Sequence, residues 1–392
     1  MDFDLTEEQR MVQEMVRSFV EKEVKPVASQ MDHDSVYPAE LVKKLGKIGL
    51  MGMFVPQEFG GSGMDLVSYI IAMEEVSKAW ASLGAIMTVN NSLVCDPILR
   101  FGSEKQKKKY LPPLAQGERL GCYALTEPGA GSDAGSIQTQ AKRGGKDYLL
   151  NGTKLFVTNG KHSDLAIVYA VTDSFRGKKG ISAFVVEKGT SGFSVGKLED
   201  KLGLRGSDTA ELFFQDCRIP KENLLGVENE GFKIALTTLE GGRIGIAAQA
   251  LGIARGCLEE SLAYAKQRRQ FGHPIADFQA VQWMLADMAT EIDAAELLTY
   301  RAAWLRQRGK KVTKEASMAK LFASEAANRI AYRAVQIFGG YGYIKEYPVE
   351  RFYRDARITT LYEGTSEIQR LIIARHLIHE GEAAYGSHED SL

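Results

Sequence analysis

The chain has 392 residues, of which 44% are hydrophobic and 25% are charged, and its formal net charge is −1. This length provides for two or three domains with a large core, and the balanced charge gives no general attraction to nucleic acid or to anionic membranes. The four cysteines lie far apart without a CxxC pair, which argues against a zinc site and a disulfide framework. No run reaches the ~18 apolar residues of a membrane span, and the acidic start differs from a targeting peptide. We therefore expect a cytoplasmic protein, or one of the mitochondrial matrix if a longer chain was processed.

Helical periodicity dominates the first part of the chain. Thr6 and Gln9 form a capping box before a helix with one apolar face. Further helices are predicted at 40–51, 66–78 and 83–101, and the last is apolar nearly all round, which indicates burial. These elements predict an N-terminal α-helical domain at 1–120.

The periodicity then changes to that of strands. Short runs rich in Val, Ile, Phe and Tyr at 166–172, 181–187 and 211–218 are bounded by turn residues. Helices and strands do not alternate here, so a nucleotide-binding parallel sheet is not expected. We predict a middle antiparallel β domain at 121–230.

Long helical patterns return after Gly231. They cover 232–266, 278–307, 314–339 and 366–379, which predicts a C-terminal four-helix bundle at 231–392. The fold class is therefore α+β multi-domain, with helical, β and helical parts in that order.

The stretch 354–378 draws attention because a carboxylate precedes a helix there. Ser366 and Gln369 are predicted to form a capping box, which places Glu363 just outside the helix N-terminus, beside Gly364. Such a carboxylate can be a general base, or it can simply complement the helix dipole. The position alone favours the dipole.

Three further stretches combine glycines with polar or basic side chains. They are the loop at 123–133, the arginine-containing segment at 267–279, and the glycine pair at 339–340. The first alone can be a tight turn and the third a C-cap, while Arg268 or Arg269 in the second could hold a phosphate. Together they favour a large polar cofactor held by glycine-rich loops, arginines and a helix N-terminus, without a Rossmann unit. The histidines form no pattern that predicts a metal site.

Several strings occur in an order and spacing that identify a family resemblance. PQEFGGSG, YALTEPGAGSD, FVTNG, KLGLRGSDTAEL, RRQFG, QIFGGYGY and YEGTSEIQR are similar to motifs of the acyl-CoA dehydrogenase flavoproteins. The resemblance covers nearly the whole chain. It implies a homotetramer that binds FAD, dehydrogenates an acyl-CoA thioester in fatty acid β-oxidation, and passes electrons to an electron-transfer flavoprotein.

The resemblance also implies which residue is the catalytic base. A base removes the α-proton while the β-hydride goes to the flavin, and in most of the family the base is the glutamate of YEGT, here Glu363. A minority carries the base on the first long helix of the C-terminal bundle. The aligned residue here is Gly242, which has no side chain to act as a base, so the choice falls on Glu363.

Other roles follow residue by residue from the same resemblance. Residues implied to contact FAD in the same subunit are Tyr123, Leu125, Thr126, Gly131, Ser132, Phe156, Val157, Thr158, Thr365 and Glu367. Residues implied to reach the FAD of a neighbouring subunit are Arg268, Gln270, Phe278, Gln279, Gln336, Ile337, Phe338, Gly339 and Gly340. Residues implied to contact the substrate are Ser132, Glu240, Arg243, Gly364 and Arg375.

The length and branching of the substrate's acyl chain are the features that the sequence determines least. The segment 81–107 most resembles the short-chain, butyryl-CoA branch, and no arginine lies within 85–94 to pair with a second substrate carboxylate. Branched-chain or cyclic acyl-CoA dehydrogenases, an acyl-CoA oxidase, and a non-catalytic FAD- or CoA-binding scaffold remain alternatives.

Overall fold

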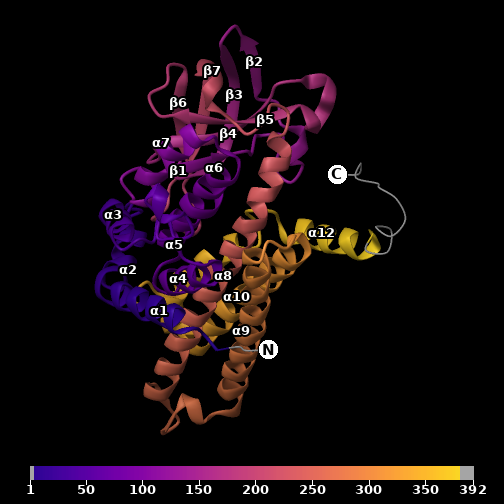
Figure 1. Cartoon of the computed structure of the whole chain (residues 1–392). Coiled ribbons are helices and arrows are strands. Elements are labelled where there is room, and N and C mark those ends of the chain that lie inside the picture. Colours follow the sequence, from indigo (N-terminus) through magenta and orange to yellow (C-terminus); the bar gives the residue numbers. More distant parts are fainter. Residues whose placement is uncertain (1–3, 380–392) are drawn as a thin grey trace.

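The sheet lies at one end of the molecule, and helices make up the rest (Figure 1). The structure, a computed structural model, describes residues 4–379. The helical, β and helical order predicted from the sequence is confirmed. Within residues 4–379, no helix combines the length and the apolar character that crossing a bilayer requires, and no His, Cys, Asp and Glu side chains group as a metal site would need.

The N-terminal part is built from short helices. The Thr6 capping box is confirmed, with Thr6 Oγ1 accepting from the Gln9 N–H at 3.2 Å and the Gln9 side chain accepting from the Thr6 N–H at 3.1 Å. The predicted helix at 83–101 contains a π-helical segment, Val89–Cys95. The α-helices are α1 (Glu7–Phe19), α2 (Lys25–His33), α3 (Ala39–Lys47), α4 (Leu66–Ala79), α5 (Ala81–Thr88), α6 (Asp96–Phe101) and α7 (Glu104–Ala115).

The middle part is one twisted sheet with the order β6-β7-β3-β2-β4-β5-β8, and β1 lies beside β4. The predicted strands are found as β4, β5 and β7. The antiparallel prediction is wrong for two pairs, because β1 and β2 both run parallel to β4. The β2–β3 hairpin between β1 and β4 gives the chain the length that a parallel crossover needs. The strands are β1 (Gly121–Ala124), β2 (Gln140–Gly144), β3 (Asp147–Thr158), β4 (Leu165–Val171), β5 (Ile181–Glu187), β6 (Phe193–Leu198), β7 (Thr209–Pro220) and β8 (Leu224–Leu225).

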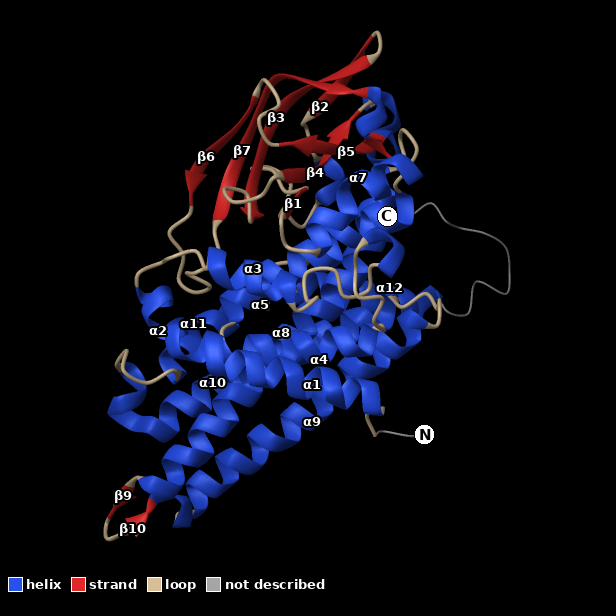
Figure 2. Cartoon of the chain, turned by 60° about the vertical axis from the view of Figure 1, so that its left-hand side comes forward, coloured by secondary structure: helices blue, strands red, loops and turns tan. Residues whose placement is uncertain are grey.

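The C-terminal part contains the predicted long helices. One further helix, α11, was not predicted, although Val349, Phe352 and Ala356 are buried at helical spacing along it. A small hairpin of β9 (Arg269–Gln270) and β10 (His273–Pro274) lies at the end of the bundle away from the sheet (Figure 2). The helices are α8 (Gly231–Gln267), α9 (Gln279–Gln307), α10 (Thr313–Phe338), α11 (Val349–Ile358) and α12 (Ser366–His379).

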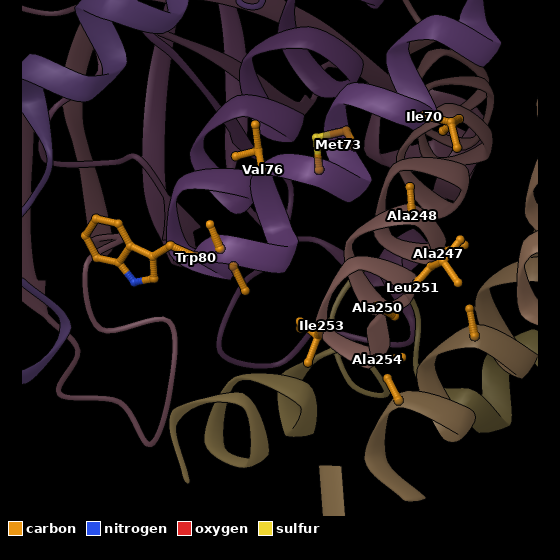
Figure 3. Packing of buried hydrophobic residues seen from close by; sticks show 14 of the residues in the cluster. Ile70, Met73, Val76, Trp80, Ala247, Ala248, Ala250, Leu251, Ile253 and Ala254 are labelled. Atoms are coloured by element: carbon orange, nitrogen blue, oxygen red, sulfur yellow. The ribbon is translucent and has the colours of Figure 1, made fainter. Parts of the chain in front are cut away.

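Helix α8 joins the parts, because α4 and α10 both pack against it. Small residues of α8 lie on its side toward α4, among them Gly245, Ala248 and Gly252, and Ala248 is seen there below Ile70 (Figure 3). A Cβ at Gly252 would lie 3.0 Å from the backbone nitrogen of Lys78 at the end of α4. The two helices therefore pack closely because α8 carries little side-chain volume on this face. This close packing fixes where the first turns of α8 stand relative to the sheet.

Candidate active site

A cavity of about 2630 Å³ lies between the sheet, the first turns of α8 and the turn before α12. Its wall brings together residues from Ala85 to His379, far apart in the sequence, because β1, β3, α8 and α12 all end or begin here. The predicted site residues that line it are Tyr123, Leu125, Thr126, Gly131, Ser132, Phe156, Thr158, Glu240, Arg243, Glu363, Gly364, Thr365 and Arg375.

The turn at Glu363 has an unusual backbone conformation. Glu363 has a φ of 52° and Gly364 a φ of 92°, and a left-handed conformation at a residue with a side chain costs about 1–3 kcal/mol. Two buried side chains hold this turn. The Gln369 amide donates to the carbonyls of Glu363 (3.2 Å) and Gly364 (2.9 Å), and Lys320 Nζ of α10 donates to the Gly364 carbonyl (2.7 Å). The tertiary structure thus imposes the conformation that directs Glu363 into the cavity.

These contacts correct the predicted capping box. Thr365, not Ser366, caps α12, since its Oγ1 accepts from the Ile368 N–H at 3.3 Å. The Ser366 hydroxyl is buried and has no hydrogen-bond partner in the described part of the chain. Gln369 instead reaches past the helix start, and its Nε2 donates to the Glu363 and Gly364 carbonyls. Its Oε1, the atom that a capping box would use as acceptor, has no hydrogen-bond partner among residues 4–379.

The Glu363 carboxylate is poised to accept a proton. The residue is partly exposed to the cavity, yet its Oε2 is shielded from solvent and has no hydrogen-bond partner among residues 4–379. Burial raises the pKa of Glu363 to about 7, and the positive charges of Lys320 and Arg243 oppose this rise. A carboxylate with a pKa near neutrality and an unengaged oxygen suits a general base.

Gly242 faces this carboxylate from α8. A Cβ at position 242 would overlap Glu363 Oε2 and would lie 2.8 Å from Glu363 Cδ and 3.0 Å from Leu93 Cδ2. A side chain at position 242 and the Glu363 carboxylate would therefore overlap, and in this structure the Glu363 carboxylate fills the space.

The loop after β1 is fastened by a buried ion pair that the sequence reasoning missed. Lys154 of β3 is fully buried, and its Nζ donates to Glu127 at 2.6 Å and to the Leu125 carbonyl at 3.1 Å. The backbone of β3 adds a hydrogen bond from the Leu155 N–H to the Thr126 carbonyl, at 2.9 Å. A lysine inside the apolar alternation of β3 was the signal that could have indicated a buried partner.

Models of three domains match the chain in order. The acyl-CoA dehydrogenase N-terminal domain matches residues 6–118, the middle domain 122–217 and the C-terminal domain 229–378. The chain belongs to the acyl-CoA dehydrogenase family.

Individual relatives agree with this family. The chain is 53% identical over 374 residues to a Clostridium acetobutylicum protein named short-chain-specific acyl-CoA dehydrogenase, covering 95% of this chain and 99% of that one. It superposes on butyryl-CoA dehydrogenase from Megasphaera elsdenii with a TM-score of 0.95 and 48% identity, over 96% of this chain and 100% of that one. A chain in a structure described as the electron transferring flavoprotein of Acidaminococcus fermentans gives a TM-score of 0.96 and 51% identity, with the same coverage.

Phe156 forms an aromatic wall of the cavity in this acyl-CoA dehydrogenase. It has a φ of 54° and is 63% exposed, at a register shift between β3 and β7. The shift is a β-bulge, which turns a side chain away from the face that alternation would give it. The next residue, Val157, is buried in the core of the sheet.

A second group of predicted residues lies elsewhere. Arg268, Gln270, Ile337, Phe338, Gly339 and Gly340 line a separate pocket of about 420 Å³. It lies at the far end of α8, about 36 Å along the helix from Arg243. Of the predicted residues, Val157, Phe278, Gln279, Gln336 and Glu367 line neither of these two cavities of the described chain. One copy of the chain therefore does not bring the two groups of residues together.

Proposed function

We propose that this acyl-CoA dehydrogenase oxidises short-chain acyl-CoA thioesters with FAD, and that Glu363 is the base that removes the α-proton. The observation that carries the proposal is the Glu363 carboxylate, with a shielded and unpartnered oxygen inside a cavity large enough for a cofactor and a thioester. The short-chain assignment is supported by the names and the identity of the relatives, and by the resemblance of residues 81–107.

The chemistry requires more than a base. The α-proton of a thioester is a weak acid, so the negative charge that develops on the carbonyl oxygen needs hydrogen-bond donors. We assign one donor to the backbone N–H of Glu363, which the left-handed turn holds fixed beside the base. Because substrate binding displaces water from the cavity, the pKa of Glu363 is expected to rise further toward that of the proton it takes.

The residues present fit FAD. Phe156 offers an exposed ring against which a flat heteroaromatic system can stack, and a Cβ at Gly131 would meet no other atom of residues 4–379 within 4 Å, so a ligand can approach this loop closely. Thr126, Ser132 and Thr158 supply hydroxyl groups along the same wall. When bound, FAD supplies the hydride acceptor.

Cationic side chains in the cavity wall suit the phosphates of coenzyme A. Arg176 and Lys178 line the cavity from the segment between β4 and β5, Lys310 from the loop before α10, and Arg375 from α12. Cations from several segments in one cavity favour a polyphosphate ligand. The acyl end of the thioester would then extend inward toward Glu363.

We further propose a homotetramer and an electron-transfer flavoprotein as the electron acceptor. The second pocket needs a neighbouring subunit if its residues are to reach an FAD bound in the large cavity. The similarity to a chain from a structure described as an electron transferring flavoprotein supports the partner.

Anaerobic titration tests this function. Butyryl-CoA should bleach the visible absorbance of the bound flavin, and Glu363→Gln should bind the ligand without bleaching. Unchanged absorbance with every acyl-CoA from propionyl to octanoyl would support the scaffold alternative instead. Wild-type turnover in Glu363→Gln would show that another residue is the base. Oxygen consumption matching turnover would favour an acyl-CoA oxidase.

A further inference from the structure

We propose that Lys320 is a positioning residue for Glu363, which fixes the turn that carries the base and keeps a positive charge next to its carboxylate. This inference rests on the proposed role of Glu363. It assigns a function to a lysine on α10 that none of the motifs above includes.

Lys320 is fully buried, which is energetically unfavourable for a charged side chain. Its side chain is fully shielded between α8, α10 and the turn before α12, and burial of an ammonium group is unfavourable unless it meets a partner. Its Nζ donates to the Gly364 carbonyl at 2.7 Å. The carbonyl belongs to the residue directly after Glu363, so the lysine holds the strained turn from outside the cavity.

The hydrogen-bond partner of Lys320 Nζ is the Gly364 carbonyl and not the Glu363 carboxylate, and this difference affects the strength of the base. A direct ion pair would occupy an oxygen of Glu363 and make it a weaker base. Instead, Glu363 Oε2 has no hydrogen-bond partner within residues 4–379. Lys320 thus contributes its charge while the oxygen that would receive the proton stays available.

The charged and titratable groups around the pair are few. Arg243 of α8 acts on both Lys320 and Glu363, and Glu325 of α10 and Glu367 of α12 act on Lys320. Burial lowers the pKa of Lys320 to about 7, and the Glu363 carboxylate opposes this fall.

Three tyrosines also adjoin the carboxylate: Tyr69 of α4, Tyr123 of β1 and Tyr362, the residue before Glu363. Burial raises the pKa of all three phenols, so all three stay neutral. Lys320 and Arg243 are therefore the cations that act on Glu363. Arg243 lines the cavity, whereas Lys320 is anchored to the turn itself.

The consequence is a base whose pKa stays near 7, and does not rise further, in a cavity that disfavours charge. Without Lys320, burial of the carboxylate would be opposed by Arg243 alone, and a larger fraction of Glu363 would be protonated. The acid limb of the pH profile of kcat/KM, which reports the base in the free enzyme, should register this change. A residue that merely supports the fold would alter the amount of active enzyme but not the midpoint of that limb.

The test compares three variants of the FAD-loaded enzyme. Lys320→Met removes the charge at similar length, Lys320→Arg keeps it, and Ser324→Ala removes a buried polar group one turn further along α10 without changing the charge. We expect Lys320→Met to move the acid limb upward by roughly one pH unit, while the other two leave the midpoint in place. The Glu363 carboxyl band in infrared difference spectra, identified by its loss in Glu363→Gln, should titrate at the same shifted pH.

Each outcome decides the proposal. An unmoved midpoint in Lys320→Met, with wild-type flavin content and melting temperature, would overturn it. If Lys320→Met does not retain FAD, Lys320→Gln carries the same expectation and the same refutation, because it keeps an amide donor but no charge. Wild-type turnover in Glu363→Gln would instead overturn the assignment of the base, so the two failures are distinguishable.

Discussion

Lys154 in β3 and Glu127 in the loop after β1 form an ion pair of 2.6 Å with both side chains buried. Glu127 also accepts from the backbone N–H groups of Gln138 (2.5 Å) and Thr139 (3.0 Å). A single carboxylate therefore joins β3 to both ends of the loop that contains Thr126 and Ser132. The loop proposed to hold the flavin is thus fixed by Glu127, which also lines the cavity, and by Lys154, which does not.

Lys154→Met should lower both stability and flavin content. The change leaves Glu127 charged, buried and without its cation, and breaking a buried pair in this way costs about 3–5 kcal/mol. Melting temperature and the ratio of FAD to protein measure the two effects. The double variant Lys154→Met/Glu127→Gln is the control, since it removes the unpaired charge and should recover part of the stability. A single variant as stable as the wild type would contradict the proposed importance of the pair.

Gly242→Ala should lower the activity without lowering the stability of the fold. The new Cβ would overlap Glu363 Oε2 and push the carboxylate from its place, and a displacement of this size can cost on the order of 10²-fold in rate. The same substitution favours the helix by about 1 kcal/mol, so the melting temperature should not fall. Gly241→Ala is the matched control, because its Cβ would approach the guanidinium of Arg306 rather than Glu363. Equal activity of the two variants would show that Glu363 does not need this space.

Arg268→Ala should weaken the retention of FAD if a neighbouring subunit shares its cofactor site. Arg268 lines the second pocket, with its guanidinium 5.2 Å from the centre of the Tyr341 ring. Arg269→Ala is the control, since Arg269 is exposed and donates to the Gly272 carbonyl within its own hairpin. Flavin content should be measured together with the sedimentation coefficient, so that loss of FAD is separated from loss of assembly. Full flavin occupancy in Arg268→Ala would exclude the proposed contact.

The sequence predicted the long elements because their periodicity is local. The helices at 232–266 and 314–339 and the strand at 181–187 need no information from distant residues, and all three were found. The strands β1, β2, β3 and β6 and the helix α11 were missed. β1 has only four residues, and the Asn151-Gly152 pair gives the long strand β3 the sequence of a turn.

The sequence predicted only those residues of the candidate site that belong to recognisable motifs. Glu363 and the glycine-rich loop were identified through the family resemblance. Lys320 and Lys154 were not, because their burial depends on partners 44 and 27 residues away in the sequence. Gln369 was placed in the wrong hydrogen bond for a different reason, since its partners Glu363 and Gly364 are only six and five residues away. The capping pattern could not show that the left-handed turn before α12 brings these two carbonyls to the Gln369 Nε2.

Glu363→Gln should alter the pH dependence of stability as well as abolish most of the dehydrogenation. The pKa of Glu363 is about 7 in the folded enzyme, against an ordinary value of 4.5. Because the folded state binds the proton more tightly, the stability that protonated Glu363 contributes is fully present below pH 4.5 and is lost as the pH rises to about 7. The shift corresponds to at most about 3 kcal/mol. Melting curves at pH 5 and pH 8 should therefore show a smaller difference for Glu363→Gln than for the wild type, and the variant should be the more stable of the two at pH 8. Asp34→Asn, a change at an exposed carboxylate distant from the cavity, is the control for the loss of one negative charge. A wild-type pH dependence in Glu363→Gln would mean that the carboxylate is not buried as the structure places it.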